Sequence, residues 1–233
     1  MLRVESLEAS YDQNQVLFGA SLEVRSGEVV ALMGRNGMGK TTTVHSIVGL
    51  VRPRAGSISF EGRALNGLPP YRIARLGIGL VPEGRQVFPT LTVRENLVAT
   101  AANHGRLRDP WTLERVFELF SQLKARAGQL GSTLSGGEQQ MLAIGRALML
   151  SPKLLIFDEA TEGLAPLIRE DIWRCLRRLK DLGHSILLID KNLDELADLA
   201  QRSYIMEKGR IVWEGATADL TRNEELRLAY LGV

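Results

Sequence analysis

The sequence predicts an α/β protein in which helices flank a mainly parallel sheet, with an antiparallel β layer at the start and an inserted helical subdomain. Three observations predict this fold. The short apolar runs Val29–Met33, Leu154–Phe157 and Ile186–Ile189 are typical of buried parallel strands, and they alternate with helical segments. The N-terminal part is rich in strand patterns. From about Phe88 to Gln129 the strand pattern disappears, and apolar residues recur at helical spacing.

The N-terminal part predicts strands around one helix. Leu2–Leu7 alternates apolar and polar residues, as an edge strand or a half-exposed strand does. Lys40–Leu50 has a helical pattern, which Arg52-Pro53 and Gly56 then break. The other elements expected here are strands at Val16–Val24, Val29–Met33, Ser57–Phe60 and Ile78–Val81, with a turn at Gly27, a tight turn over Glu61–Arg63 and a stop at Pro82.

The C-terminal part predicts a helix between two buried strands, followed by a hairpin. The apolar face of that helix carries Ile168, Ile172, Cys175, Leu176 and Leu179. Its opposite face, expected to be solvated, carries Arg169, Arg174, Arg177 and Lys180. Tyr204–Met206 and Arg210–Glu214 are expected to pair across Lys208-Gly209, and a helix at about Glu224–Leu231 closes the chain. Because Cys175 is the single cysteine, it forms no internal disulfide, and we expect a small core residue.

The domain organisation follows from these elements and from the composition. We expect one domain over residues 1–233, with a core of residues 1–87 and 151–233 and a helical subdomain of residues 88–150. Hydrophobic residues make up 45% of the chain, which is enough to fill an ordinary globular core. The net charge of +2 lacks the basic excess of a nucleic-acid-binding protein. The sequence has neither the roughly 18 successive apolar residues of a membrane helix nor a secretory signal, so a soluble chain is expected.

A glycine-rich string, GRNGMGKT, follows the first buried strand and opens the first helix. Gly34, Gly37 and Gly39 allow a tight turn whose amide N–H groups point inward. The helix that begins at about Lys40 directs its positive dipole end at the same point. Lys40 offers a cation to the β- and γ-phosphates, and Thr41 offers a hydroxyl to Mg²⁺. Strand, loop and helix in this order predict a cradle for the phosphates of a nucleotide.

Two adjacent acids, Asp158 and Glu159, end the buried strand that starts at Leu154. In an open α/β sheet, ligands bind beyond the carboxyl ends of the strands. Asp158 is therefore expected to help hold Mg²⁺, directly or through water, and Glu159 to orient and deprotonate the attacking water. Adjacent acids at a strand end can also be simple surface residues. The cradle in the same chain favours the catalytic interpretation.

A second string, LSGGEQQ at Leu134–Gln140, lies 100 residues after the first, with LLIFDE close behind it. In this order and spacing the three strings resemble the nucleotide-binding subunits of ABC transporters, over essentially the whole chain. LSGGE is the specific element, because most other P-loop ATPases lack it. The resemblance implies an ATPase whose two subunits pack head to tail. Two ATP molecules then lie between the cradle of one subunit and the LSGGE of the other.

The resemblance also implies site residues. Ser135, Gly136 and Gly137 are expected to touch the γ-phosphate held by the partner subunit, and Ser135 with Glu138 forms a capping box at a helix start. Tyr11 matches the position where the family stacks an aromatic ring on adenine; a plain core or surface aromatic is the alternative. The complete sets are Tyr11, Gly34, Asn36, Gly37, Gly39, Lys40, Thr41, Thr42, Ser135, Gly136, Gly137 and Glu138 for ATP, then Thr41, Asp158 and Glu83 for Mg²⁺, and Glu159, Lys40 and Lys191 for catalysis.

The sequence departs from the usual family pattern at three positions. Glu83 in VPEGR stands where Gln is common, Ala165 in TEGLAP where Asp is common, and Lys191 in IDKN where a switch His is expected. VPEGR and EGLAP resemble the branch that imports branched-chain and other amino acids, whose members come as two distinct ATPase subunits. Lys191 offers a positive charge to the γ-phosphate, but a flexible point charge does not copy the hydrogen-bond geometry of imidazole. The histidines that fall elsewhere and are expected to be ordinary surface or helix residues are His45, His104 and His184.

The resemblance implies the function of an ATP-binding subunit of an amino-acid importer, with branched-chain amino acids as the expected cargo. ATP and Mg²⁺ are the implied cofactors. The implied partners are an identical or a sister ATPase, integral-membrane permease subunits and, indirectly, a periplasmic binding protein, with no nucleic acid. The loop Glu83–Leu91 resembles the surface that receives the permease, and Phe88 is expected to be an exposed anchor there, or else a core residue.

The implied location is peripheral, on the cytoplasmic face of the bacterial inner membrane. Three alternatives remain open from the sequence. The first is an importer ATPase for another small solute, such as urea or amides. The second is a soluble ABC ATPase outside transport. The third is a module that senses ATP without hydrolysing it, which the departures at Glu83, Ala165 and Lys191 favour and the presence of Glu159 and Lys40 disfavours.

Overall fold

The computed structural model describes residues 1–232. At the centre of the fold lies a six-stranded sheet. Its strands are β3 (Val29–Met33), β6 (Ile78–Val81), β7 (Leu154–Asp158), β8 (Ser185–Ile189), β9 (Arg202–Glu207) and β10 (Arg210–Ala216), in the order β10-β9-β3-β8-β7-β6. β3 pairs in parallel with β8 and β9, β7 pairs in parallel with β8 and β6, and β10 pairs antiparallel with β9. The carboxyl ends of β3, β8 and β7 therefore lie side by side.

Alternate residues of the parallel strands face two separate hydrophobic cores. In β3, Ala31 and Met33 pack into one core, whereas Val30 and Leu32 pack into the other. All four side chains are fully buried, because both faces of the sheet are covered. Burial on both faces is why these strands have unbroken apolar sequences rather than an alternating pattern.

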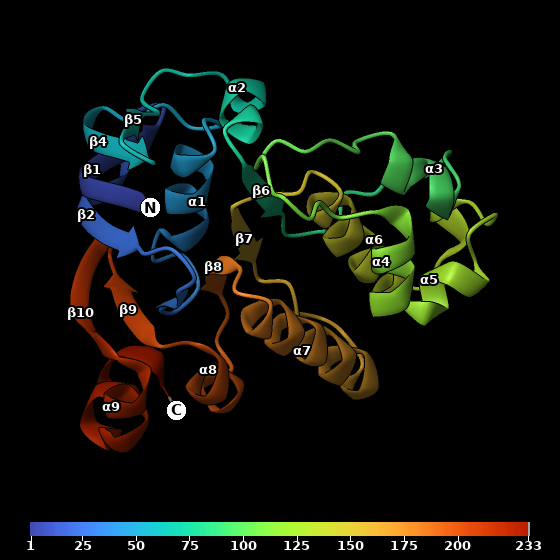
Figure 1. The fold of residues 1–233 in the computed structure, drawn as a ribbon. Helices are drawn as coiled ribbons and strands as arrows, with labels where there is room; N and C mark the ends of the chain where they lie inside the picture. The colour runs from blue at the N-terminus through green and yellow to red at the C-terminus, as the bar shows by residue number, and fades with distance from the viewer. Residues whose placement is uncertain (233) are drawn as a thin grey trace.

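An antiparallel sheet in the order β2-β1-β4-β5 covers one of these faces together with α1 (Lys40–Ile47) (Figure 1). Its strands are β1 (Leu2–Tyr11), β2 (Asn14–Val24), β4 (Ala55–Phe60) and β5 (Arg63–Ala64). β1 alternates buried and exposed residues, as predicted for a half-exposed strand. The edge-strand alternative is wrong, because β1 pairs with β2 on one side and with β4 on the other.

The opposite face packs against α7 (Pro166–Asp181) and a helical lobe, which stands apart from the β-rich lobe in Figure 1. The helices of that lobe are α3 (Val93–Val98), α4 (Leu113–Leu119), α5 (Ser121–Ala125) and α6 (Gly136–Leu148), all inside the stretch 88–150 that the sequence predicts to be helical. On α7, Cys175 lies in the core, as expected, and burial raises the pKa of its thiol. In the described part of the chain, no helix is both long enough and apolar enough to cross a membrane.

Several short elements differ from the sequence expectation. The first helix ends at Ile47 rather than at Leu50. The pattern does not predict the helices α2 (Pro70–Arg75), α8 (Leu193–Leu199) and α9 (Thr217–Arg222), because six or seven residues are too few to establish helical periodicity. The expected C-terminal helix is instead one α-helical turn, α10 (Glu224–Leu226), followed by a π-helical turn, η2 (Arg227–Leu231).

His184 is neither a helix residue nor a simple surface residue. It is half-buried just before β8, and the Trp111 indole Nε1 donates a hydrogen bond to its Nε2 over 3.2 Å. Because an indole N–H only donates, this His184 nitrogen must be unprotonated. Burial, aided by the positive charge of Arg115, accordingly lowers the pKa of His184 below its ordinary 6.5.

We predict that this histidine makes the stability of the fold depend on pH. The unfolded state binds a proton at His184 more readily than the folded state does. The contribution of neutral His184 to the free energy of unfolding is therefore complete above pH 6.5, and it is lost as the pH falls toward the pKa of His184 in the folded state. The loss amounts to at most about 1.4 kcal/mol per pH unit in that window. Urea unfolding of wild type and His184→Gln between pH 7.5 and 5 measures it. Gln keeps an acceptor but does not titrate, so identical pH dependence of the two proteins would contradict the prediction.

Candidate functional site

The glycine-rich loop connects the end of β3 to the start of α1. Gly34, Gly37 and Gly39 have φ angles of 141°, 79° and 106°, a region that side chains rarely adopt. A Cβ added at Gly34 would lie 2.3 Å from the backbone oxygen of Met206 in β9, so the loop passes the sheet too closely for a side chain. α1 begins at Lys40, which places the N-terminal amide groups of a helix at the loop, as the sequence predicts for an anion cradle.

The Lys40 ammonium is held across the mouth of this loop. It is only 6% exposed, and its Nζ donates to the backbone oxygens of Gly34 and Arg35 over 2.9 and 3.1 Å. The Glu159 carboxylate lies 3.6 Å from the same Nζ. The Lys40 ammonium is therefore suited to exchange these backbone oxygens for the phosphate oxygens of a bound nucleotide.

Thr41 and Asp158 form a pair that fits Mg²⁺ bound to a nucleotide. The Thr41 hydroxyl donates to Asp158 Oδ1 over 3.3 Å. Asp158 is buried at the end of β7, and this burial raises the pKa of its carboxyl; the charge of Glu83, in the exposed loop after β6, adds to the effect. In residues 1–232, no cluster of three or more His, Cys, Asp or Glu could hold a metal by itself. Mg²⁺ characteristically takes one or two carboxylates and completes its shell with substrate phosphates and water, which is what Thr41 and Asp158 permit.

Glu159 has the environment of a general base. It adopts a positive φ of 50°, and its backbone N–H donates to the Ile189 oxygen of β8 over 3.0 Å, which turns its side chain toward Lys40. A hydrogen bond with the Glu162 carboxylate, together with burial, raises the pKa of Glu159 to about 7. A carboxyl group that titrates near neutral pH is matched to proton transfer from water.

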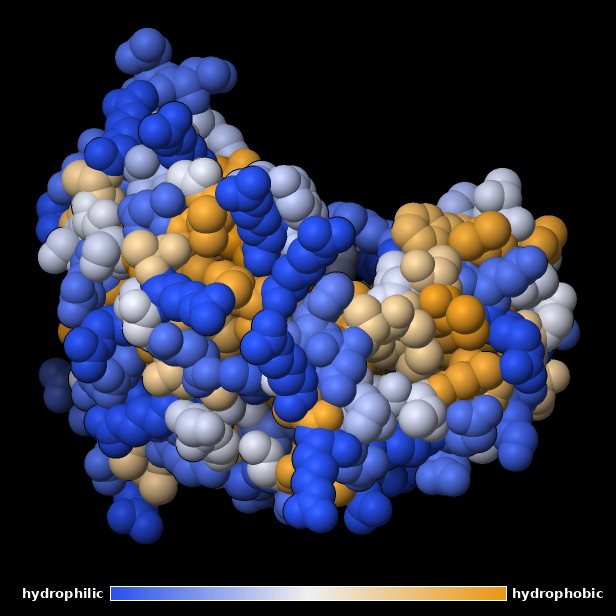
Figure 2. Space-filling view, turned by 45° about the horizontal axis from the view of Figure 1, so that its top comes forward, coloured by the Kyte–Doolittle hydropathy of each residue, from blue (hydrophilic) through white to orange (hydrophobic). Residues whose placement is uncertain are grey.

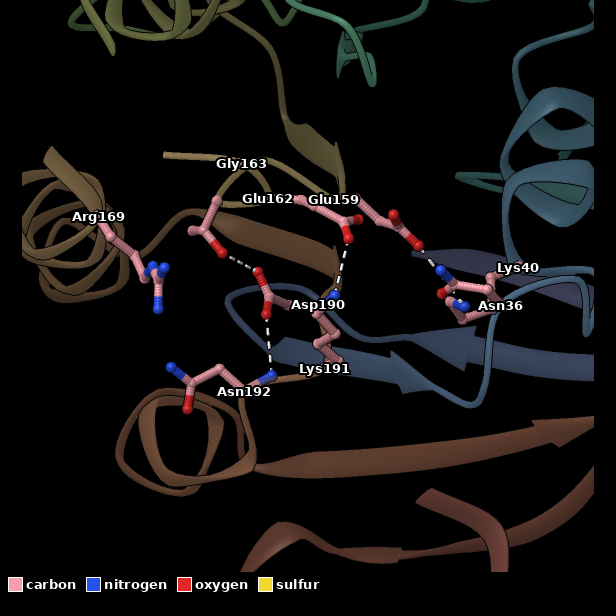
Figure 3. Close-up of a pocket in the computed structure, with 10 residues that line it drawn as sticks. Asn36, Lys40, Glu159, Glu162, Gly163, Arg169, Asp190, Lys191 and Asn192 are labelled. Carbon is pink, nitrogen blue, oxygen red and sulfur yellow. Dashed lines mark hydrogen bonds and ion pairs between the residues drawn. The ribbon is translucent and has the colours of Figure 1, made fainter. Parts of the chain in front are cut away.

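Lys191 lies in the same pocket but contacts another acid. In Figure 3 its side chain rises from the loop after β8 toward Glu162, and Lys191 Nζ is 2.7 Å from Glu162 Oε1. The adjacent Asp190 is buried and is bound separately: the Thr161 hydroxyl and the Asn192 backbone N–H both donate to its carboxylate. Lys191 thus lines the pocket, and its catalytic role stays a prediction; the sequence does not reveal Glu162.

The pocket that contains Lys40, Glu159 and Lys191 is small. Its volume is about 180 Å³, and its lining consists of Asn36, Lys40, Glu159, Thr161, Glu162, Gly163, Arg169, Asp190, Lys191 and Asn192. Sites that enclose a drug-sized ligand usually measure about 300–1,000 Å³. A pocket of this size accommodates only part of a nucleotide, and none of the LSGGE residues belongs to its lining.

The LSGGE residues form a helix start in the other lobe. Ser135 caps α6: its hydroxyl accepts from the Glu138 N–H, and its own N–H donates to Glu138 Oε2, which is the predicted capping box. Ser135 is exposed, so this end of α6 lies at the surface of the chain. Gly137 is buried against Ile168 of α7, and the guanidinium of Arg85 lies against Gly136.

The remaining predicted ATP ligands occupy different surroundings. Asn36 lines the pocket beside Lys40 (Figure 3). Thr42 is buried in the first turn of α1. Tyr11 is 45% exposed at the end of β1, which excludes the core-aromatic alternative, and its hydroxyl lies 3.4 Å from His45 Nδ1 of α1. An exposed ring beside the helix that follows the cradle is available for stacking on a base.

The sequence pattern does not identify two residues near the site, Glu162 and Arg85. Glu162 lies three residues after Glu159, and in a loop this spacing is only a weak signal for a carboxyl pair. Arg85 is 51 residues from Gly136 in the chain, so only the packing of the VPEGR loop on α6 brings them together. The i, i+3 spacing of Glu159 and Glu162 was the one local signal that could have suggested a carboxyl pair.

The loop that resembles a permease-binding surface is exposed. Phe88 is 40% exposed, so the core alternative is wrong, and the Arg146 guanidinium carbon lies 3.9 Å from its ring centroid. The buried Asn96 holds the Phe88 backbone by accepting from its N–H and donating to its oxygen, each over 2.9 Å. Figure 2 shows a hollow between the two lobes, with apolar surface on the helical lobe beside it.

Comparisons with known proteins agree on the family. The family model for ABC transporters matches residues 17–162. A high-affinity branched-chain amino acid transport ATP-binding protein, BraG of Pseudomonas aeruginosa, is 44% identical over 232 residues, covering 100% of both chains. A lipopolysaccharide export system ATP-binding protein, LptB of Haemophilus influenzae, is 36% identical over 234 residues, covering 100% of this chain and 97% of LptB.

Solved structures with the same fold include an ATP-binding subunit of an ABC transporter, with a TM-score of 0.84, 32% identity and coverage of 100% of this chain and 96% of that one. The ADP conformation of an ATP-binding cassette has a TM-score of 0.81 and 27% identity, and covers 97% and 96% of the two chains. The fold predicted from the sequence is thus confirmed.

We predict that Gly137 and Gly136 differ sharply in their tolerance of a methyl group. A Cβ at Gly137 would lie 2.4 Å from Ile168 Cγ2, inside a packed contact, so Gly137→Ala should destabilise the fold by about 1–3 kcal/mol. At Gly136 the Cβ meets only the mobile end of Arg85, so Gly136→Ala serves as the matched control. Thermal and urea unfolding compare the two; equal stability of both variants would contradict the packing argument.

Proposed function

This chain belongs to the ABC transporter family and is an ATPase subunit of it, and on that premise we propose that it powers the uptake of amino acids, branched-chain ones first, through a membrane permease. The observation that carries the choice of cargo is the full-length identity of 44% to a branched-chain amino acid transport protein, against 36% to a lipopolysaccharide export protein. The VPEGR and EGLAP strings favour the same branch.

The chemistry proposed is in-line attack of water on the γ-phosphoryl group of ATP. Lys40 and the amide groups of the Gly34–Gly39 loop stabilise charge on the phosphates. Glu159 orients the attacking water and accepts its proton. Thr41, Asp158 and Glu83 are the residues that would hold Mg²⁺, and the ion would supply positive charge that neutralises the phosphates. Tyr11, Asn36 and Thr42 are proposed to contact the rest of the nucleotide.

The complete site is proposed to need a second ATPase subunit, identical or a sister chain. The pocket is too small to enclose ATP, and Ser135, Gly136, Gly137 and Glu138 are not among its lining residues. Head-to-tail pairing would place the exposed start of α6 from one subunit over the cradle of the other, where its amide groups meet the γ-phosphate. Closure on ATP then pushes on the permease, docked at the cytoplasmic side of the membrane beside Phe88.

We predict that Glu159→Gln separates ATP binding from hydrolysis. A general base supplies about 10²–10⁴-fold, so kcat should fall by that factor, equivalent to about 3–5.5 kcal/mol of barrier, while ATP still binds. Steady-state phosphate release and ATP binding by fluorescence measure the two effects. Normal turnover of the variant would remove Glu159 from the role of base.

The same variant tests the composite site. Glu159→Gln should accumulate as an ATP-bound dimer in size-exclusion chromatography with light scattering. Adding Ser135→Arg should abolish the dimer, because a long side chain would block the start of α6. Ser132→Arg, an exposed serine three residues earlier in the same lobe, is the matched control and should leave the dimer intact. Dimers that persist with Ser135→Arg would contradict the head-to-tail arrangement.

The cargo proposal is tested with the whole transporter. The chain is purified together with candidate permease subunits and a periplasmic binding protein, and the complex is placed in proteoliposomes. Binding protein loaded with leucine should stimulate ATP hydrolysis and leucine uptake. Stimulation by urea or an amide instead would keep the importer and correct the cargo, whereas failure to assemble with any permease would contradict a transport function.

A further inference from the structure

Building on the proposed ATPase function, we propose that Glu162 is a positioning residue for ATP hydrolysis, and that Lys191 acts by holding Glu162 rather than by touching the γ-phosphate. The pair would fix the loop that carries Glu159. The contact that carries this proposal is the ion pair in the pocket, in which Lys191 Nζ lies 2.7 Å from Glu162 Oε1.

Three successive contacts join the loop after β7 to the loop after β8. The Glu159 backbone N–H donates to Ile189 O over 3.0 Å. The Thr161 hydroxyl donates to Asp190 Oδ2 over 2.5 Å, and both side chains are buried. Lys191 then reaches Glu162. The residues of one loop thus contact the residues of the other in order along the chain. The Lys191–Glu162 ion pair is the last of these three contacts, and we call it the outermost tie.

A displacement of Glu162 is transmitted directly to Glu159. The Glu162 backbone N–H donates to the Glu159 backbone oxygen over 3.2 Å, which closes a turn of four residues. Glu159 is also held at a positive φ of 50°, a conformation that the surrounding contacts must maintain. Both carboxylates line the same pocket (Figure 3). The outermost tie therefore helps to fix the direction of the Glu159 side chain.

Within residues 1–232, Glu162 is the acid that forms an ion pair with Lys191. Asp190 already accepts from Thr161 and from the Asn192 N–H, and Glu159 is paired with Lys40. Without Lys191, the Glu162 carboxylate would lose the cation 2.7 Å away that fixes its position, and its hydrogen bond with Glu159 would no longer be held in place from the loop after β8. Without Glu162, the Lys191 ammonium would lose its tie to the loop.

The pair is too exposed to matter for the stability of the fold. Lys191 is 71% exposed and Glu162 41% exposed, and ion pairs at such positions contribute little to folding. A comparable pair outside the pocket, Lys153 Nζ–Glu61 Oε2 at 2.6 Å, has side chains 34% and 39% exposed and provides a matched control. An effect on hydrolysis without an effect on melting would thus reflect the position of Glu159.

A double-mutant cycle on the full-length chain, with its transporter partners, tests the proposal. Lys191→Met and Glu162→Gln should each lower kcat about tenfold with little change in KM, and the double variant should also be lowered about tenfold rather than about a hundredfold, because both changes break one tie. Lys191→Arg keeps the ion pair and should retain kcat within about threefold of wild type. Lys153→Met and Glu61→Gln should leave kcat unchanged.

Hydrogen–deuterium exchange of the nucleotide-free chain gives a readout that needs no turnover. Peptides that cover Glu159–Gly163 should exchange faster in Lys191→Met and in Glu162→Gln than in wild type, while the melting temperature stays the same. The same peptides in Lys153→Met should exchange at the wild-type rate. Unchanged exchange in both pocket variants would overturn the proposal.

Two further outcomes separate this proposal from the function on which it rests. If wild type hydrolyses ATP but the effects of Lys191→Met and Glu162→Gln multiply, or if Lys191→Met alone weakens ATP binding, then Lys191 contacts the phosphate and the positioning role is wrong. If wild type neither binds nor hydrolyses ATP, the proposed function fails, and faster exchange in the pocket variants would then only describe a structural tie.

Discussion

The parallel register of β3, β8 and β7 is the constraint on which the rest of the site depends. Because the strands run in one direction and lie side by side, the loops that leave their carboxyl ends meet at one edge of the sheet. β3 delivers the glycine loop and Lys40, β7 delivers Asp158 and Glu159, and β8 delivers the loop with Lys191. Residues more than a hundred positions apart thereby come within hydrogen-bonding distance.

The electrostatics of this edge favour a polyanion with a divalent cation. Lys40 is buried and bound to backbone oxygens, while Asp158 is buried with Thr41 as its hydrogen-bond partner. Burial raises the pKa of Asp158, and the hydrogen bond with Glu162 raises that of Glu159. The Lys40 ammonium is paired with Glu159, whereas Thr41 gives Asp158 a hydrogen bond but no charge. Mg²⁺ beside Asp158 would supply that charge, with the phosphates beside Lys40.

The two lobes divide the work of the site. The β-rich lobe holds the cradle, and α6 lies in the helical lobe (Figure 1). Ser135, at the start of α6, is exposed. Capping by Glu138 and the tight contact of Gly137 with Ile168 fix this helix start against α7. The proposed head-to-tail pairing would join the small pocket of one subunit to the exposed start of α6 of another.

The sequence by itself determined the local parts: the apolar strands, the glycine loop before α1, the acids at the end of β7 and the capped start of α6, since each depends on neighbours within a few residues. It left the short helices undetected, because six or seven residues give too little periodicity. Only the tertiary structure decided that β1 is an inner strand, that Arg85 lies on Gly136 and that Lys191 pairs with Glu162, 29 residues away. Such contacts depend on strand order and loop packing, which no local pattern of residues specifies.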